Sequence, residues 1–160
     1  MAFQTTWYFS ELSEKVVEFI ERDLSEDSNI SDTHWVGGFV WHYIDRANRE
    51  NFLYDLSHLD GDSVKLKIYN EGDEESWNVD AKPSIDENIR KISFIVQLSD
   101  HNDYEGGNIQ VLDETSNMYN VPRKRGTVSL FDSTAQYRML KVTKGTRKSL
   151  VGWAVGKRWT

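Results

Sequence analysis

The stretch RKISFIVQLSD at residues 90–100 decides the fold class, because apolar and polar side chains alternate along it. The apolar residues at even positions from Ile92 to Leu98 fall on one side of an extended chain, and Ser93 and Gln97 fall on the other. A period of two residues is typical of a β-strand. The stretch therefore predicts a strand with one buried face.

Further strands are predicted on both sides of this stretch, and helices are predicted before it. The strands are expected at 64–68, 108–112, 118–121, 126–131, 138–143 and 147–155. Apolar residues at three- and four-residue steps predict a helix at 11–24, capped by Ser10, and a second helical region from Val40 to Leu56, with a loop at 25–32 between them. Trp77 and Trp153 lie in strand-like segments and are expected in the core. Helices followed by many short strands predict an α+β domain, in which a β sandwich or barrel carries the helices on one side.

Length, charge and composition exclude several classes of protein. The 160 residues fit a single domain, 1–160, with helical support in 1–60 and a β core in 61–160. The absence of cysteine excludes disulfides and thiolate metal sites. A formal net charge of −7, with only a short basic cluster at 123–125, argues against nucleic-acid binding. Neither a signal peptide nor an apolar run of membrane-spanning length is present, so we expect a cytoplasmic protein without membrane contact.

Several blocks of sequence carry a resemblance to a known family. The run at 90–100 is followed by DYEGGN at 103–108, PRKRGTV at 122–128, FDS at 131–133 and VTKGTRKSLVGW at 142–153. In order and spacing these blocks resemble the prolyl 4-hydroxylase-like branch of the iron and 2-oxoglutarate dioxygenases. The resemblance implies a double-stranded β-helix, a jelly-roll or cupin-like fold, with the N-terminal helices packed on one side. WYF at 7–9 and HWVGGF at 34–39 also resemble the compact stand-alone versions encoded by tailed phages, notably those of cyanobacteria.

The metal-binding positions that this resemblance implies are altered. Members of the family hold Fe(II) with a His, a carboxylate two residues later and a distant His. The resemblance places Asn78 at the first His, retains Asp80, and places Tyr137, ten residues before Arg147, at the distant His. An amide oxygen is a weak donor to ferrous iron, and a tyrosine must first lose a proton with a pKa of about 10. We therefore expect no iron here, with Asp80 a metal ligand only if the chain is active. Four histidines lie outside these positions and are expected to be surface or packing residues: His34, His42, His58 and His101.

The positions that contact 2-oxoglutarate in the family are better kept. The resemblance implies that Arg147 grips the far carboxylate of 2-oxoglutarate, with Ser149 beside it and Tyr69 assisting. In the alternative interpretation Arg147 pairs with Asp80 or another buried acid, because an unpaired buried charge is costly.

Three functions follow from these expectations. The leading hypothesis is a non-catalytic dioxygenase-fold protein without cofactor, acting as a structural or assembly module and, through the phage resemblance, as a virion component. Its expected partners are other protein chains, either phage structural proteins or further copies of itself, and its expected place is the host cytoplasm and then the particle. The first alternative is an active Fe(II) and 2-oxoglutarate-dependent dioxygenase that acts on a prolyl or other side chain. The second is a metal-free module that binds 2-oxoglutarate or another anion.

Overall fold

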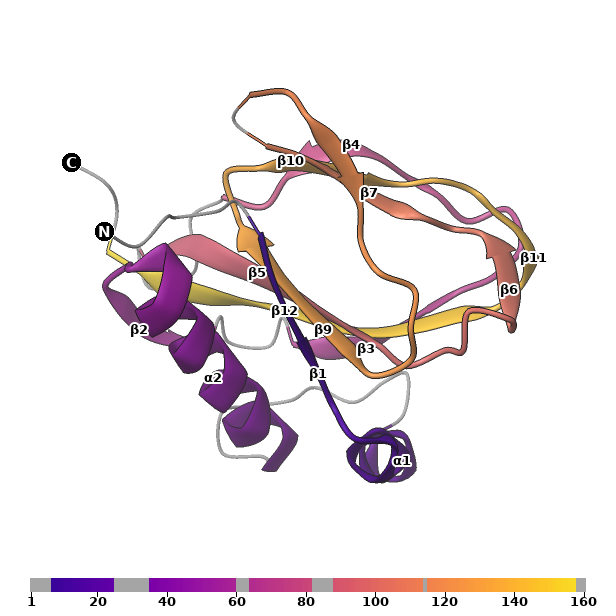
Figure 1. Ribbon diagram of the computed structural model, residues 1–160, viewed down its shortest axis with the longest axis horizontal. Helices are drawn as coiled ribbons and strands as arrows, with labels where there is room; N and C mark the ends of the chain where they lie inside the picture. The colour runs from indigo at the N-terminus through magenta and orange to yellow at the C-terminus, as the bar shows by residue number, and fades with distance from the viewer. Residues whose placement is uncertain (1–6, 25–34, 60–63, 82–87, 114, 158–160) are drawn as a thin grey trace.

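Two facing β-sheets form the body of the protein, and two helices lie against the outer face of the larger sheet (Figure 1). The computed structural model describes residues 7–24, 35–59, 64–81, 88–113 and 115–157. In chain order the elements are β1 (Trp7–Glu11), α1 (Glu14–Asp23), α2 (Trp35–Ala47), the π-helical turn η1 (Asn48–Phe52), β2 (Leu56–Leu59), β3 (Lys65–Tyr69), β4 (Glu75–Val79), β5 (Ile89–Gln97), β6 (Tyr104–Gly106), β7 (Ile109–Leu112), β8 (Met118–Asn120), β9 (Thr127–Asp132), β10 (Gln136–Met139), β11 (Val142–Gly145) and β12 (Arg147–Gly156).

The larger sheet has the order β1-β9-β5-β12-β2, and β3 also pairs with β12. All of these pairings are antiparallel. Every residue of β5 from Lys91 to Gln97 is buried, so the expectation of a single buried face on this strand is wrong. The reason is that β5 is a central strand with cover on both sides, from the helices on one face and from the smaller sheet on the other.

The smaller sheet has the order β4-β10-β7-β8, and a separate two-stranded sheet joins β11 to β6. The region 138–143, expected to be one strand, is divided between β10 and β11. The strands β1 and β2 lie within the first 60 residues and pair in the larger sheet, so this part of the chain supplies strands as well as helices.

The first helix begins later than the sequence pattern predicts. Its N-cap is Ser13, whose Oγ accepts a hydrogen bond from the Val16 amide at 3.4 Å. Ser10 and Glu11 belong instead to β1, which pairs with β9. The aromatic run at 7–9 favours a strand, and pairing with a buried neighbour overrides the helical pattern that begins at Glu11.

The second helical region ends earlier than expected. The helix α2 passes into η1, and Leu53 then adopts φ 58°, a left-handed conformation that ends a helix. Leu56 lies in β2. The whole of the loop expected at 25–32, like His34, lies outside the described residues. No helix in the described ranges has the length and hydropathy needed to span a membrane.

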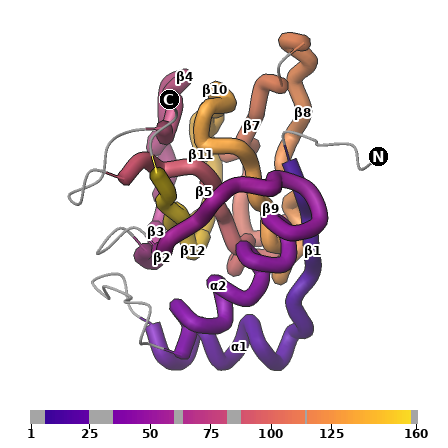
Figure 2. The backbone as a smooth tube through the Cα atoms, turned by 90° about the vertical axis from the view of Figure 1, so that its left-hand side faces the viewer, coloured from indigo at the N-terminus to yellow at the C-terminus, as the bar shows by residue number. Residues whose placement is uncertain are grey.

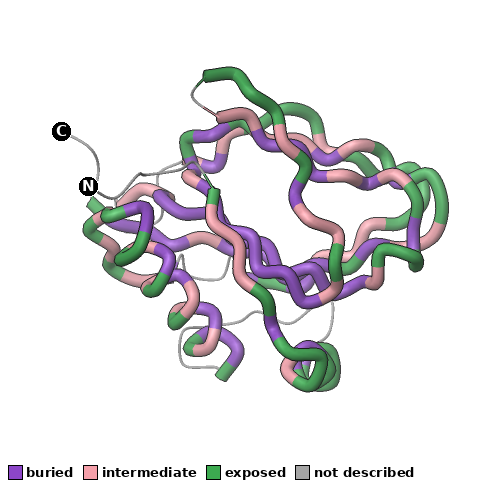
Figure 3. Tube along the Cα trace, viewed as in Figure 1, coloured by how far each residue is buried: buried purple, intermediate pink, exposed green. Residues whose placement is uncertain are grey.

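Two apolar clusters, one on each face of the larger sheet, make up the core (Figures 2 and 3). Figure 2 shows α1 and α2 on the same side of the sheets, where they cover the first cluster. The first cluster includes Ile20, Ile44, Ile92, Phe94, Leu130 and Leu150. The second lies between the two sheets and includes Ile95, Val111, Phe131, Met139, Val142 and Val151. The candidate site opens beside this second cluster.

Candidate functional site

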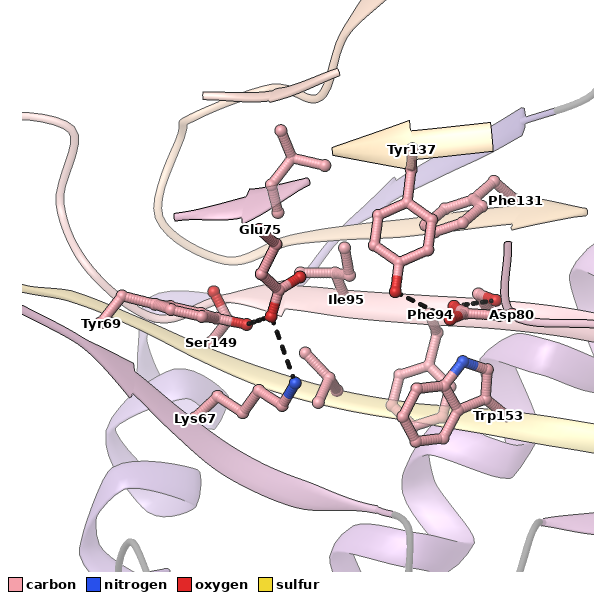
Figure 4. Close-up of a pocket in the computed structure, with 13 residues that line it drawn as sticks. Lys67, Tyr69, Glu75, Asp80, Phe94, Ile95, Phe131, Tyr137, Ser149 and Trp153 are labelled. Atoms are coloured by element: carbon pink, nitrogen blue, oxygen red, sulfur yellow. Dashed lines mark hydrogen bonds and ion pairs between the residues drawn. The ribbon is translucent and has the colours of Figure 1, made fainter. Parts of the chain in front are cut away.

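A pocket opens between the two sheets, and both polar and apolar side chains line it (Figure 4). Its cavity is about 30 Å³, which is room for about one or two water molecules. It continues outward into an open mouth that is lined in part by Trp77, Asn78 and Arg90. The hydrogen-bonding side chains of the inner pocket are Lys67, Tyr69, Glu75, Asp80, Ser93, Tyr137, Ser149 and Trp153.

Strand β12 forms the floor of the pocket, because its side chains alternate between the two faces of the larger sheet. Ser149, Val151 and Trp153 line the cavity, whereas Leu150 and Ala154 pack on the helical side of the sheet. The strand period of two explains why every second residue after Arg147 turns toward the space between the sheets. The expectation that Trp153 is a core residue is therefore only partly right, since it lines the pocket. Trp77, also expected in the core, is 39% exposed.

Asp80 is held by hydroxyl groups. It is 4% exposed, and it accepts hydrogen bonds from Tyr137 Oη to Oδ1 at 2.7 Å and from Ser93 Oγ to Oδ2 at 2.8 Å. Ser133 Oγ lies 2.9 Å from Ser93 Oγ and extends this network into the core. Burial, together with the neighbouring negative charges of Asp80 and Glu75, raises the pKa of Tyr137 above its ordinary value. The phenol is therefore a protonated hydrogen-bond donor at neutral pH.

Arg147 has a different partner from the one expected. It is 2% exposed, its Nε and Nη2 donate to Gln97 Oε1 at 3.2 and 3.0 Å, and its Nη1 donates to the Gly107 carbonyl at 2.9 Å. These acceptors are neutral oxygens, so among the described residues the hydrogen bonds of Arg147 do not go to Asp80 or to another buried acid, as the alternative interpretation expected. Burial lowers the pKa of the Arg147 guanidinium.

The other two positions assigned to 2-oxoglutarate both line the pocket. Tyr69 Oη donates to Glu75 Oε1 at 3.1 Å. Ser149 is fully buried, and its Oγ has no hydrogen-bond partner among the described residues. Burial and the charge of Glu75 raise the pKa of Tyr69, so this phenol is also protonated at neutral pH.

Glu75 and Lys67 are site residues that the sequence did not reveal. Lys67 Nζ forms an ion pair with Glu75 Oε1 at 3.4 Å. A regular strand would place Glu75 and Asp80 on opposite faces, because they are an odd number of residues apart. However, Asn78 pairs with Tyr137 and Glu75 pairs with Met139, so two residues of β4 oppose one residue of β10. This β-bulge lets both carboxylates line the same pocket.

Comparison with models of protein families shows which superfamily the chain belongs to. The model of the 2OG-Fe(II) oxygenase superfamily matches residues 64–155. The chain belongs to this superfamily. The expected double-stranded β-helix is also confirmed, since the structure superimposes on oxygenases of this fold. One is a Pseudomonas putida prolyl-4-hydroxylase, with a TM-score of 0.71 and 15% identity over 96% of this chain and 89% of that one. Another is a viral collagen prolyl hydroxylase from Paramecium Bursaria Chlorella virus-1, with a TM-score of 0.71 and 14% identity over 96% and 97% of the two chains.

Two proteins with similar sequences match a shorter part of this chain than the family model does. A PKHD-type hydroxylase of Synechococcus sp. (strain CC9311) is 37% identical over 62 residues, which are 39% of this chain and 28% of the relative. A PKHD-type hydroxylase of Picosynechococcus sp. (strain ATCC 27264 / PCC 7002 / PR-6) is 40% identical over 63 residues, again 39% and 28% of the two lengths. The matched stretch thus spans little more than a quarter of these relatives.

The donor set at the three positions that the sequence resemblance assigns to the metal, Asn78, Asp80 and Tyr137, does not fit Fe(II). Asn78 is exposed on β4, and the Tyr137 hydroxyl donates a hydrogen bond to the one carboxylate, Asp80. Ferrous iron needs deprotonated ligands, and a buried phenol with a raised pKa does not supply one. Within the described ranges no group of three or more His, Cys, Asp or Glu side chains is placed to hold a metal. No histidine is found among the described residues that line the pocket or its mouth.

Proposed function

We propose that this chain is a non-catalytic member of the 2OG-Fe(II) oxygenase superfamily, whose pocket is stabilised by hydrogen bonds in place of a metal centre. The observation that carries the proposal is the 2.7 Å hydrogen bond from Tyr137 Oη to Asp80 Oδ1. It joins two of the three positions at which the family binds iron, and it turns the remaining carboxylate into an acceptor for protein hydroxyls.

The direct experiment is to load the purified protein with Fe(II) under anaerobic conditions, remove unbound metal and measure iron, and then to add 2-oxoglutarate and oxygen and measure succinate. We expect iron and succinate at the level of an Asp80→Ala variant, which controls for adventitious binding. The double variant Asn78→His, Tyr137→His restores two imidazoles and should gain iron, because imidazole is a ligand suited to Fe(II). Stoichiometric iron in the unaltered protein, with succinate formed from 2-oxoglutarate, would contradict the proposal.

An active Fe(II) and 2-oxoglutarate-dependent hydroxylase is the second candidate. Its support is the identity of 37% and 40% to two relatives that are named PKHD-type hydroxylases. The same measurement of iron and succinate decides between the two candidates.

The metal-free 2-oxoglutarate or anion-binding module receives less support from the geometry. Arg147, the expected grip for a carboxylate, already directs three of its N–H groups at Gln97 and Gly107. In its favour, the buried Ser149 hydroxyl has no hydrogen-bond partner among the described residues, and Lys67 lines the same pocket.

We further propose that the domain acts through contacts with other protein chains, either phage structural proteins or further copies of itself, in the host cytoplasm and then in the virion. The phage assignment rests on the sequence resemblance described above. The contact role is supported by aromatic rings along α2, where Trp35 is 42% exposed and the ring centroids of Trp35, Phe39 and Tyr43 follow one another at 6.4 and 5.1 Å. Light scattering on the wild type and on Trp35→Ala tests the self-association branch, which predicts an oligomer that the substitution at this exposed ring dissociates.

A further inference from the structure

Glu75 is a carboxylate directed into the inner pocket. Its Oε1 accepts a hydrogen bond from Tyr69 Oη at 3.1 Å and forms an ion pair with Lys67 Nζ at 3.4 Å. Figure 4 shows Glu75 between these two side chains, with both interactions converging on the same carboxylate oxygen. The Glu75 side chain is 31% exposed, so it is part of the pocket wall and is not free in solvent.

The bulge in β4 places this carboxylate on the same pocket wall as a second one, Asp80. Two negative charges in a partly buried space repel each other, and this repulsion must be offset by groups that favour a carboxylate at each position. For Asp80 those groups are the hydroxyls of Tyr137 and Ser93. For Glu75 they are Tyr69 and Lys67.

The surroundings of Glu75 are those of an anion-binding site. A cation, Lys67, and a phenol, Tyr69, line the same cavity as the buried hydroxyl of Ser149, which has no hydrogen-bond partner among the described residues. The buried guanidinium of Arg147 donates to the neutral oxygens of Gln97 and Gly107.

We propose that Glu75 is a built-in carboxylate that fills the anion-binding end of the pocket and closes it to small carboxylates from solution. This inference deepens the proposed function and rests on it, because a pocket that carries its own carboxylate does not need a soluble co-substrate. The inner cavity of about 30 Å³ has room for water only, and Lys67 and Glu75 also line the open mouth outside it, by which a small carboxylate would reach Lys67 once the Glu75 side chain is removed.

Removing the Glu75 side chain tests the proposal. Glu75→Ala keeps Cβ and deletes a fragment that matches acetate, so acetate is the probe and acetamide is its uncharged control. The matched control variant is Glu74→Ala, which removes an exposed carboxylate next to it in the chain. Thermal unfolding is followed with sodium acetate, acetamide, sodium succinate, 2-oxoglutarate and sodium chloride at equal ionic strength.

We expect Glu75→Ala to lower Tm by roughly 5 °C, because Lys67 and Tyr69 lose their acceptor. Acetate, and either dicarboxylate, should restore a large part of this loss beyond the effect of chloride, whereas acetamide should not. The wild type and Glu74→Ala should respond to these carboxylates no more than to chloride. An acetate response of Glu75→Ala no larger than that of Glu74→Ala overturns the proposal.

A second pair of variants tests the proposal if Glu75→Ala does not fold. Glu75→Gln keeps the shape of the side chain and removes its charge, and Glu74→Gln is its control. The proposal requires a lower urea midpoint for Glu75→Gln than for Glu74→Gln, and equal midpoints overturn it. The experiments on Glu75 measure the stability of variants. The proposed function is contradicted by a different result, namely iron binding and succinate formation in the wild type, so failure of one proposal can be told from failure of the other.

Discussion

Replacing Tyr137 by Phe tests the interaction that we propose in place of metal binding. The substitution keeps the ring, whose centroid lies 5.4 Å from that of Phe131, and removes only the hydroxyl that donates to Asp80 at 2.7 Å. Asp80 is 4% exposed and would keep one side-chain donor, Ser93. A hydrogen bond to a charged acceptor contributes about 1.5–3 kcal/mol, and an under-satisfied buried group adds to the loss. We therefore expect the free energy of unfolding to fall by about 2–3 kcal/mol, or Tm to fall by roughly 4–12 °C for a chain of this size.

The assay is urea unfolding followed by tryptophan fluorescence, with the slope m unchanged so that the midpoint reports stability. Tyr119→Phe is the matched control, since the Tyr119 hydroxyl is buried without a partner among the described residues. Its removal should change stability by less than about 0.5 kcal/mol or increase it. In an Asp80→Asn background the effect of Tyr137→Phe should shrink, because the two groups interact directly. Equal losses for Tyr137→Phe and Tyr119→Phe would refute the reasoning.

Two further predictions concern pH and backbone conformation. Burial raises the pKa of Tyr69, Tyr119 and Tyr137 above the ordinary value of 10.0, so their contribution to stability is complete below pH 10 and is lost as pH rises further. Tyrosinate absorbance during alkaline titration should rise cooperatively with unfolding, and independent ionisation of these phenols in the folded protein would contradict this. Gly145 has φ +76°, and a Cβ there would overlap the backbone oxygen of Asp103, so Gly145→Ala should cost about 2 kcal/mol or more in urea unfolding. A variant as stable as the wild type would show that this turn is not constrained.

The fold could be predicted from the sequence because its signals are local and repeated. Alternation in β5, and ordered blocks that end with β12, mark the strands at the centre of the larger sheet. The strand β1 was missed because its pairing with β9 joins residues more than a hundred positions apart, and a local helical pattern follows it directly. Tertiary pairing therefore decided the start of α1.

The candidate site was predictable only in part. The structure joins Tyr137 and Asp80, two of the positions that the resemblance assigned to the metal, by a hydrogen bond. The partners of Arg147 could not be inferred, since Gln97 and Gly107 come from another strand and a loop. Glu75 was hidden for a different reason, because a bulge breaks the strand period that sequence patterns rely on.

The position of β12 has a consequence for how this domain could change its chemistry. This strand pairs with β5 on one side and with β2 and β3 on the other, so its amides should be among the slowest in the protein to exchange with solvent. Asn78 and Tyr137 lie in the other sheet, on β4 and β10. Substitutions at these two positions leave the most protected strand untouched. Asn78 and Tyr137 can therefore change while the pairing of β12, which also carries Arg147 and Ser149, is kept.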